Sequence, residues 1–493
     1  MQRTGDEHLA SLCDGRVVYL GSERVADVTT HPAFREAARS VAQLYELKRD
    51  PANRDALSFV EDGERFSLYF LRPRTREDLL ARMRAHKRIA DASYGLMGRS
   101  PDHVASFVAG MVLQPEALGE ASRRDRSFAR NLIDYYDGAR RRDDYIAYAV
   151  IPPAGARDPK FSGRVYEASP NLRVTKEDDA GVTVSGMKLL ATGAIFANEL
   201  WIGNVQPVPP DRKAEAITCA VPMATPGVSL WARRPFAPQA QCEYDNPLSF
   251  RFDESDSVVV FDEVKVPWER VFCHDDAPRS REIYIKTPSH SFGNHQSTVR
   301  FWAKLELLVG LASKIAWAGN LQRVPAVRDT LGRLAAMEAM LAAMIHGQCL
   351  DPEDLGNGYV AFNRRYVYGA MSWCTENYQE ICEAVRELMG AGPFLMPADA
   401  SVLSDASLRP TFERYWGTEN AAAAERLKLY RLAWDLLGSE FGARQAQYEK
   451  FYAGPVFVVR DHSFRECPWP RFDGIVDDLL ARYDEPGARP PAQ

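Results

Sequence analysis

The sequence predicts an α+β protein in which helices, strands and helices occupy separate regions of the chain. The first 145 residues are charged and helix-rich, residues 146–276 carry apolar residues at alternating positions, and beyond about residue 280 the apolar spacing becomes helical. This order differs from the alternating strands and helices of a dinucleotide-binding fold. We expect three domains, at residues 1–145, 146–276 and 277–493.

Each region has its own pattern. The N-terminal region contains charged helical segments such as residues 76–90. The breaker cluster Ile151-Pro-Pro-Ala-Gly155 opens the middle region. The apolar residues that predict short strands there are Val182, Val184, Ile217, Cys219, Val221, Val258–Phe261, Val264 and Val266.

The C-terminal region is expected to form a helical bundle. Its apolar residues recur at steps of three and four, and each such stripe is interpreted as core packing. The three stripes are Phe301, Leu305, Leu308, Leu311 and Ile315; Leu331, Leu334, Met337, Leu341 and Met344; and Leu427, Tyr430, Trp434, Leu437 and Phe441.

Composition excludes several functional classes. The 493 residues are 46% hydrophobic and 26% charged, with a net charge of −6 and the two signs interspersed, which argues against a nucleic-acid groove or a polybasic membrane patch. Eight cysteines without a C-x-x-C pair predict reduced thiols and no metal site. We find no export signal, and the apolar stretch 307–319 is too short to cross a bilayer, so we expect a cytoplasmic protein without membrane contact.

Two local segments suggest more than packing. Residues 98–103 form a turn that carries Arg99 and His103, and residues 438–444 interrupt a helical stripe with two glycines. Glycine within a helix costs about 1 kcal/mol relative to alanine, so such a position suggests a ligand or a backbone at close range. The alternative interpretations are an ordinary turn and an ordinary helix end. G-x-G-x-x-G after a strand, P-loop, H-E-x-x-H and G-x-S-x-G motifs are absent from the sequence.

Six segments in order along the chain resemble blocks of the 4-hydroxyphenylacetate 3-hydroxylase family. They are residues 20–34, 93–102, 184–193, 246–254, 258–271 and 436–444. The resemblance implies an acyl-CoA-dehydrogenase-like fold with an α-helical N-terminal domain, a central β-barrel and a C-terminal four-helix bundle. It also implies a homotetramer.

The resemblance implies the oxygenase component of a two-component monooxygenase. A separate NAD(P)H:flavin reductase would supply FADH2 by diffusion, and O2 would form a C4a-hydroperoxyflavin that hydroxylates an aromatic substrate. That substrate would be phenol-like, tyrosine-like or another electron-rich ring, either free or tethered to a carrier. The missing nicotinamide motif agrees with this division of work.

The resemblance also assigns residues. Arg99 falls on an arginine near both flavin and substrate, where it would act in catalysis and in binding. Asn204 is placed among the substrate-binding residues. The residues assigned to the flavin are Arg99, Pro153, Arg157, Thr192, Gly438, Ser439, Glu440, Phe441 and Arg444, with Arg157 displaced by one extra residue in its turn.

Two departures from the family pattern concern the residue that would act as the catalytic base. His103 stands where the family has a tyrosine, and counting back from Pro153 places the family histidine at Ala147. Either His103 or Tyr148 takes the role, or the substrate needs no base. If residues 99–103 are helical, Arg99 and His103 share a face. His103 and Tyr148 are therefore the two candidates for this catalytic role, and together with Ala147 they are expected to line the substrate site.

Two other functions remain open. A flavin-dependent oxidase or dehydrogenase on the same scaffold would act on a non-phenolic natural-product intermediate, although no catalytic carboxylate can be assigned. Iron–sulfur chemistry would need cysteine spacings that this sequence lacks. A non-catalytic relative that retains the fold is the second alternative.

Overall fold

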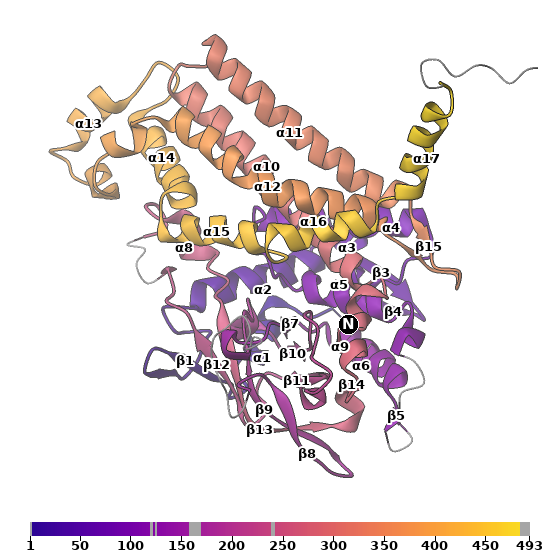
Figure 1. Cartoon of the computed structure of the whole chain (residues 1–493). Helices are drawn as coiled ribbons and strands as arrows, with labels where there is room; N and C mark the ends of the chain where they lie inside the picture. Colours follow the sequence, from indigo (N-terminus) through magenta and orange to yellow (C-terminus); the bar gives the residue numbers. More distant parts are fainter. Residues whose placement is uncertain (1, 119–121, 124–125, 157–168, 238–241, 484–493) are drawn as a thin grey trace, which may run out of the picture.

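The computed structural model describes residues 2–118, 122–123, 126–156, 169–237 and 242–483. In Figure 1 the strands lie in the lower part of the molecule, and the long helices α10, α11 and α12 lie above them. Helices α15 and α16 run along the boundary between these two parts. The three regions predicted from the sequence therefore form two layers.

The N-terminal region is mainly helical, as predicted. Threonine side chains begin two of its helices with capping boxes, Thr4 for α1 and Thr75 for α4. The helices are α1 (Gly5–Ser11), α2 (Arg35–Arg49), α3 (Arg54–Leu57), α4 (Arg76–Ala92), α5 (Asp102–Met111) and α6 (Phe128–Arg142).

This region also contains strands that the sequence analysis missed. They are β1 (Val17–Leu20), β2 (Glu23–Val25), β3 (Ser58–Glu61), β4 (Glu64–Ser67), β5 (Ser122–Arg123) and β6 (Arg126–Ser127). Strand β1 pairs in parallel with β12, so the N-terminal region supplies part of the central sheet. Four residues are too few to show a reliable period.

The middle region forms two sheets around one core. A six-stranded sheet has the order β2-β1-β12-β13-β9-β8, and a four-stranded sheet has the order β14-β11-β10-β7. Val184 and Val259 from the larger sheet belong to the same buried cluster as Leu200 and Ile217 from the smaller sheet. The strands are β7 (Ile146–Ala149), β8 (Arg173–Glu177), β9 (Gly181–Lys188), β10 (Glu199–Ile202), β11 (Ile217–Pro222), β12 (Val228–Ala232), β13 (Ser257–Pro267) and β14 (Val271–His274).

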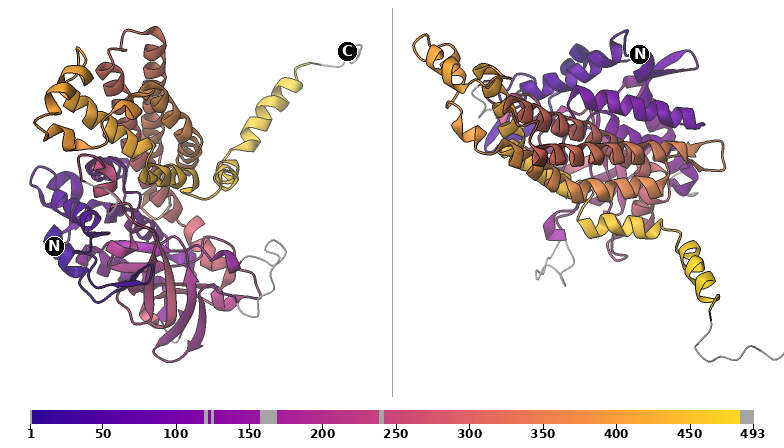
Figure 2. Two further views of the ribbon diagram at one scale, coloured as in Figure 1. Left: turned by 90° about the vertical axis from the view of Figure 1, so that its left-hand side faces the viewer. Right: turned by 90° about the horizontal axis from the view of Figure 1, so that it is seen from above.

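The C-terminal region packs three long helices against several shorter ones. Helix α10 contacts α4 and α5 on one side and α11 and α12 on the other, so it joins the two layers. Figure 2 shows α10, α11 and α12 side by side. The helices are α8 (Pro247–Arg251), α9 (Ala277–Ile285), α10 (Ser289–Ala318), α11 (Pro325–Leu350), α12 (Arg364–Met389), α13 (Arg409–Trp416), α14 (Ala423–Leu437), α15 (Glu440–Phe451), α16 (Val456–Arg465) and α17 (Trp469–Leu480), and the strands are β15 (Glu353–Asp354) and β16 (Val360–Ala361).

Helix α17 projects away from the rest of the chain (Figures 1 and 2). Its apolar residues Ile475, Val476, Leu479 and Leu480 are all more than half exposed. Among the described helices, none is long and apolar enough to cross a membrane.

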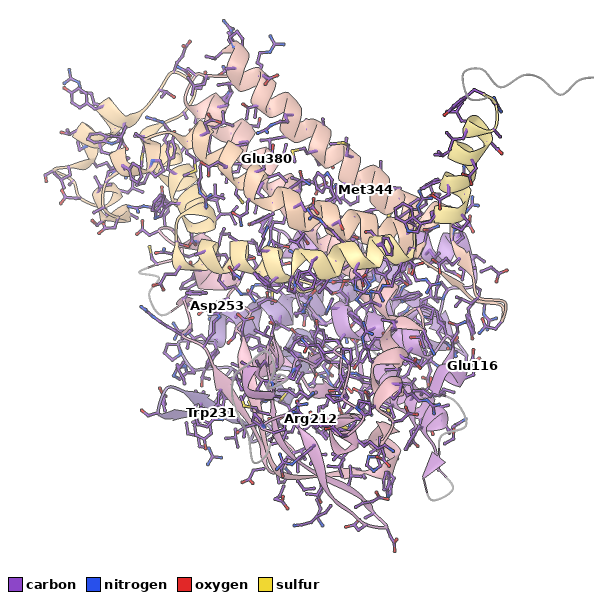
Figure 3. All side chains as sticks on the ribbon, in the orientation of Figure 1. Glu116, Arg212, Trp231, Asp253, Met344 and Glu380 are labelled. Atoms are coloured by element: carbon purple, nitrogen blue, oxygen red, sulfur yellow. The ribbon has the colours of Figure 1, made fainter. Side chains whose placement is uncertain are left out.

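The two layers meet near residues 253–256. Figure 3 shows Met344 and Glu380 on the upper helices, Trp231 and Arg212 in the strand-rich part, and Asp253 where the layers meet. Segments distant in sequence converge there, because the carboxylates that follow α8 face cations carried by α15 and by the loop after β12. This boundary holds the residues considered next.

Candidate active site

A cavity of about 1080 Å³ lies between the strand-rich part and helices α15 and α16. Its volume is slightly above the roughly 300–1,000 Å³ typical of small-molecule sites. Much of its wall is aromatic, which gives an apolar surface with a few polar groups. The aromatic residues that line it are Phe107, Tyr148, Trp201, Tyr284, Tyr448, Phe451, Tyr452 and Phe457.

Arg99 reaches this cavity from a clamped turn. Its backbone N–H donates to Glu254 at 2.9 Å, and the Tyr145 hydroxyl donates to its carbonyl oxygen. Gly98 precedes it for a steric reason, since a Cβ there would lie 2.0 Å from the Tyr448 hydroxyl oxygen. These contacts to the backbone of residues 98 and 99 fix the position of the arginine.

Three tyrosine rings surround the Arg99 guanidinium. Its central carbon lies 4.2 Å from the ring centroid of Tyr452, 5.2 Å from that of Tyr148 and 5.5 Å from that of Tyr448. One nitrogen donates to the Tyr452 carbonyl oxygen at 3.3 Å, whereas Nη1 is buried without a partner. A buried donor without an acceptor is costly, so this atom suits a polar ligand in the cavity.

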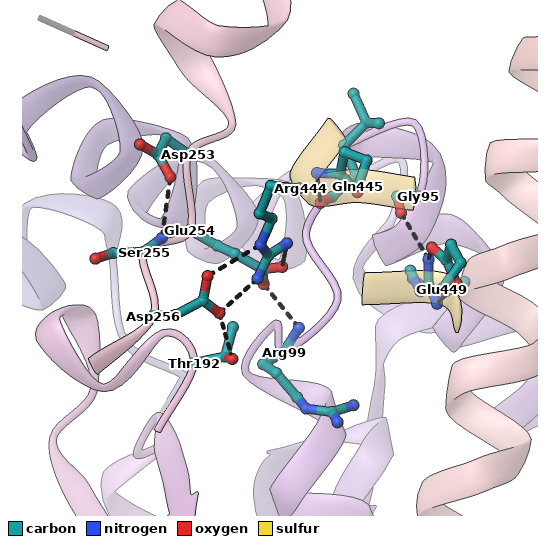
Figure 4. A network of polar contacts seen from close by, with 12 residues as sticks. Gly95, Arg99, Thr192, Asp253, Glu254, Ser255, Asp256, Arg444, Gln445 and Glu449 are labelled. Carbon is teal, nitrogen blue, oxygen red and sulfur yellow. Dashed lines mark hydrogen bonds and ion pairs between the residues drawn. The ribbon is translucent and has the colours of Figure 1, made fainter. Parts of the chain in front are cut away.

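Arg444 connects α15 to the strand-rich part through two carboxylates (Figure 4). It donates to Asp256 at 2.6 and 3.0 Å and to Glu254 at 2.7 Å. Arg233 also donates to Asp256, at 2.8 Å, and Thr192 does so through its hydroxyl at 2.6 Å. Burial alone would raise the pKa of Asp256, but the two guanidinium groups hold it well below its usual range. Thr192, Asp256 and Arg444 all line the cavity.

His103 lies directly behind the cavity wall. It is fully buried, and its ring centroid is 5.1 Å from that of Phe107, 5.7 Å from that of Tyr148 and 6.1 Å from that of Tyr452. Burial and the nearby Arg99 charge hold its pKa well below the usual value, so the imidazole is neutral. His103 was predicted to line the substrate site, but it does not line the described cavity, whereas Phe107, Tyr148 and Tyr452, whose rings it contacts, do.

A hydrogen-bonded chain determines which His103 nitrogen carries the proton. The Gln296 amide nitrogen lies 3.4 Å from Asp102 Oδ1, so its carbonyl oxygen is the atom 2.8 Å from His103 Nδ1. A carbonyl only accepts, and Nδ1 therefore carries the proton. Nε2 keeps its lone pair and is buried without a partner. Asp102 accepts in turn from His86 at 2.7 Å.

Helix α5 begins at Asp102, so Arg99 lies in the turn before it. The condition under which Arg99 and His103 would share a helix face, a helix over residues 99–103, is therefore not met. They are brought together by Tyr452, whose ring contacts the guanidinium and whose hydroxyl oxygen lies 3.3 Å from His103 Nδ1.

The packing of strand β7 contradicts the expectation that Ala147 lines the substrate site. Tyr148 pairs with Trp201 in the parallel ladder, and both line the cavity. Ala147 pairs with Leu200, and both belong to the core cluster on the other face of the strand. Ala147 therefore does not line the substrate site, and the residue of β7 that faces the cavity is Tyr148.

Two other assigned positions lie away from the cavity. Asn204 is buried, accepts from Lys188 at 2.8 Å and donates to the carbonyl oxygens of Glu215 and Ile217. Its amide is thus satisfied within the β-region, and the assignment to the substrate site is wrong. Pro153 is buried next to the cavity-lining Ile151 but does not itself line the cavity. Arg157 lies outside the described residues.

The segment 438–441 forms the break between α14 and α15. Ser439 caps α15 by accepting from the Gly442 N–H at 3.1 Å, Phe441 packs in the core, and Glu440 is exposed. A Cβ at Gly442 would lie 2.4 Å from the Leu436 carbonyl oxygen, so this glycine permits a close backbone turn. Gly438, Ser439, Glu440 and Phe441 do not line the described cavity, whereas Arg444, one turn further along, does.

The sequence analysis missed Asp256, Gln296, Tyr448 and Tyr452. A signal was present for two of them, because Arg444, Tyr448 and Tyr452 recur at four-residue steps and so share one helix face. Gln296 lies on α10, far from His103 in sequence, and nothing local indicates the contact.

The donor set fits a flavin. Arg99 Nη1 and the Tyr448 hydroxyl are buried, without partners, and belong to residues that line the cavity. Aromatic walls with a few such polar groups match a planar, polar-edged ring system. Among the described residues, no group of three or more histidine, cysteine and acidic side chains could hold a metal ion.

Both halves of the chain match family models of known proteins. Residues 4–273 match the family model of the 4-hydroxyphenylacetate 3-hydroxylase N terminal, and residues 280–481 match that of its C terminal. The pyoverdin chromophore biosynthetic protein PvcC of Pseudomonas aeruginosa is 34% identical over 98% of this chain and 96% of its own length. The 4-nitrophenol 2-monooxygenase oxygenase component of a Rhodococcus species is 32% identical over 98% and 93%.

A solved structure is similar over nearly the whole chain. It is the oxygenase component of 4-hydroxyphenylacetate 3-monooxygenase, complexed with FAD and 4-hydroxyphenylacetate. The TM-score is 0.90 at 29% identity, covering 97% of this chain and 98% of that chain.

Proposed function

The chain belongs to the 4-hydroxyphenylacetate 3-hydroxylase family, and from this premise we propose that it is the oxygenase component of a two-component, reduced-flavin-dependent monooxygenase. Its reaction is the hydroxylation of an aromatic ring. The observation that carries the proposal is the aromatic-walled cavity in which Arg99, Thr192 and Arg444 gather, within a fold shared with an FAD-bound oxygenase component.

The cofactor is FAD, used in its reduced form together with O2. Arg99, Thr192 and Arg444 would hold it, and Tyr448 would offer its unpartnered hydroxyl. When bound, reduced FAD activates dioxygen for transfer to the ring.

The chain's own residues then perform three tasks. The aromatic walls exclude water, which limits the loss of reducing equivalents as peroxide. The Arg99 guanidinium stabilises negative charge on an oxygen of the substrate. His103 is a positioning residue for Tyr452, and its neutral ring keeps positive charge away from Arg99.

The oxygenase works with a separate flavin reductase and an aromatic substrate. We infer further that the chain assembles into a homotetramer, as the family resemblance implies; the exposed apolar residues of α17 support contact with a partner subunit. We also retain the boundaries near residues 145 and 276 as proposed domain limits, since α6 ends at Arg142, β7 begins at Ile146 and β14 ends at His274.

The direct test supplies reduced flavin from an unrelated reductase. The purified chain alone should not oxidise NAD(P)H, and adding the reductase with FAD should start oxygen consumption coupled to hydroxylation of a phenol panel. A chain that oxidises NADH with substrate turnover on its own would contradict the two-component assignment. Failure to hydroxylate any electron-rich ring under these conditions would contradict the monooxygenase assignment.

A further inference from the structure

One end of the cavity, below α16, is basic. Arg281 on α9 and Arg465 on α16 line it, together with His290 and His462. Asp461 is the acidic residue that lines this end, and Arg465 already binds it at 2.9 Å. None of these side chains has a part in the oxygen chemistry described above.

Arg281 is a cation that forms no ion pair with any residue that the structure describes. Among the residues that the structure describes, no carboxylate lies within ion-pair distance of its guanidinium. Its Nε is buried and has no hydrogen-bond partner. Its charge nevertheless reaches the cavity, because it contributes to the lowered pKa of both His290 and His462.

The two histidines are neutral hydrogen-bonding groups. Burial, followed by the neighbouring charges, lowers the pKa of His290 to about 3 and that of His462 to about 4. Arg465 donates to His462 Nδ1 at 3.0 Å, and a guanidinium can only donate, so the His462 proton lies on Nε2. This end of the cavity therefore offers two guanidinium groups and an imidazole N–H.

We propose that this basic end, Arg281, Arg465 and His462, binds an anionic oxygen group carried by the aromatic substrate. Carboxylate and phosphate share the required chemistry, since guanidinium forks bind both through charge-assisted hydrogen bonds. The inference rests on the proposed function and extends it to a substrate class: electron-rich rings that bear an acidic substituent or an acidic tether.

The position within the cavity favours the substrate over the flavin phosphates. The carried-over flavin residues Thr192 and Arg444 lie toward the start of α15, and α15 and α16 follow one another across Figure 1. Helix α16 alone spans roughly 14 Å from Val456 to Arg465 at about 1.5 Å per residue. Ring centroids lie 5.9 Å apart for Tyr148 and Phe107, 6.5 Å apart for Phe107 and His290, and 4.7 Å apart for His290 and His462. The basic end thus adjoins the aromatic wall formed by Tyr148 and Phe107, against which a substrate ring would pack.

The test measures equilibrium binding and does not depend on turnover. The probes are 4-hydroxyphenylacetate, 3-(4-hydroxyphenyl)propanoate, their methyl esters, and the phosphopantetheinyl thioester of each acid. The variants are Arg281→Gln, Arg281→Lys and Arg465→Gln. Arg460→Gln is the matched control, because Arg460 lies on the same helix but is 64% exposed and pairs with Glu376 at 2.8 Å.

We expect the wild type to bind an anionic probe at least roughly tenfold more tightly than the matching ester. Arg281→Gln should abolish this preference, Arg281→Lys should keep part of it, and Arg460→Gln should leave it unchanged. A preference for the free acid identifies the anion as a carboxylate, and a preference for the thioester identifies it as the tether phosphate.

Three results would overturn the inference. The first is a wild type without anion preference, including one that binds neither member of any pair. The second is a preference that survives both Arg281→Gln and Arg465→Gln in folded protein. The third is an Arg281→Gln variant that loses FAD affinity but keeps the acid preference, which would assign this end to the flavin. Failure of hydroxylation with intact acid preference would contradict the proposed function alone.

Discussion

At the scale of single residues, the sequence did not predict which side chain of strand β7 faces the cavity. The family pattern has a histidine at the position of Ala147. Successive side chains of a strand point to opposite faces, so a shift of one residue in the assignment moves the side chain to the other face of the strand. The structure places Ala147 in the core and Tyr148 in the cavity. Sequence alone does not say which of two adjacent residues faces a ligand, because that depends on how the whole strand packs.

This difference can be tested with one substitution at each position. Tyr148→His should put an imidazole in the cavity and retain folding and measurable hydroxylation. Ala147→His should overpack the core and lower the free energy of unfolding by about 1–3 kcal/mol without adding activity. Urea unfolding and product assays measure the two effects. A stable, more active Ala147→His variant would restore the original assignment.

The Arg99 guanidinium is positioned to form a planar, bidentate interaction with a ligand in the cavity. Arg99→Lys should bind FAD nearly normally but lose at least about tenfold in coupled product, because lysine lacks the planar donor fork. Arg99→Ala should lose at least as much. Product and hydrogen peroxide are measured per oxygen consumed. If coupling in both variants equals that of the wild type, Arg99 has no role at the reacting atoms.

His103 is expected to act through Tyr452. His103→Ala should lower product formation at least about tenfold and release more hydrogen peroxide, with the fold intact, because Tyr452 loses the contact that positions it beside Arg99. Gln296→Leu should produce the same uncoupling with His103 present, because Nδ1 then loses its acceptor. A purely packing role would show normal coupling in Gln296→Leu.

At the scale of elements, the apolar stripes predicted helices more reliably than they predicted helix ends. The third stripe was interpreted as one helical face, and the chain divides it into α14 and α15 at Gly438 and Ser439. Leu427 and Phe441 are buried on either side of the break, whereas Trp434 is 40% exposed. The two glycines did indicate the break, which is a helix end at Gly438 and Ser439, whereas Arg444 of the same segment lines the cavity.

Helix α15 depends on Arg444 for its attachment to the β-region. Arg444→Gln removes the guanidinium that binds the buried Glu254 and the partly buried Asp256, although Asp256 keeps Arg233. We expect the free energy of unfolding to fall by about 3 kcal/mol and FAD binding to weaken. Arg234→Gln, which removes an exposed 3.7 Å pair with Glu440, should cost less than about 1 kcal/mol. Denaturant unfolding compares the two; equal losses would contradict this attachment.

At the scale of the whole molecule, composition and periodicity predicted the order of the regions and the family resemblance predicted the shared fold. They did not predict the boundary cavity, because its walls include residues of α5, β7, β10, α9, α10, α15 and α16, and only long-range packing brings these elements together. For the same reason, local patterns do not indicate the polar groups at this boundary, such as the buried Gln296 and the partly buried Asp256.

The buried histidines predict how stability depends on pH. Burial, with nearby cations, holds the pKa of His8, His103 and His295 well below the usual value and lowers that of His86, while that of His290 is about 3. Below pH about 6.5 the unfolded chain therefore binds more protons than the native state. Stability is fully present above this pH and falls on acidification, by up to about 1.4 kcal/mol per pH unit for each histidine. Urea unfolding between pH 8 and 5 measures this slope; a flat profile would show that these imidazoles are not buried.

The parallel pairing of β1 with β12 has a consequence for synthesis on the ribosome. Residues Val17–Leu20 pair with Ser229–Ala232, so about 210 further residues must be translated before this partner strand exists. At roughly 5–20 residues per second, the nascent N-terminus waits on the order of 10–40 s. During that interval β1 and β2 form at most an isolated hairpin, which is marginally stable in water. Nascent chains arrested near residue 200 should therefore expose this segment to protease, and chains arrested well beyond residue 300 should protect it.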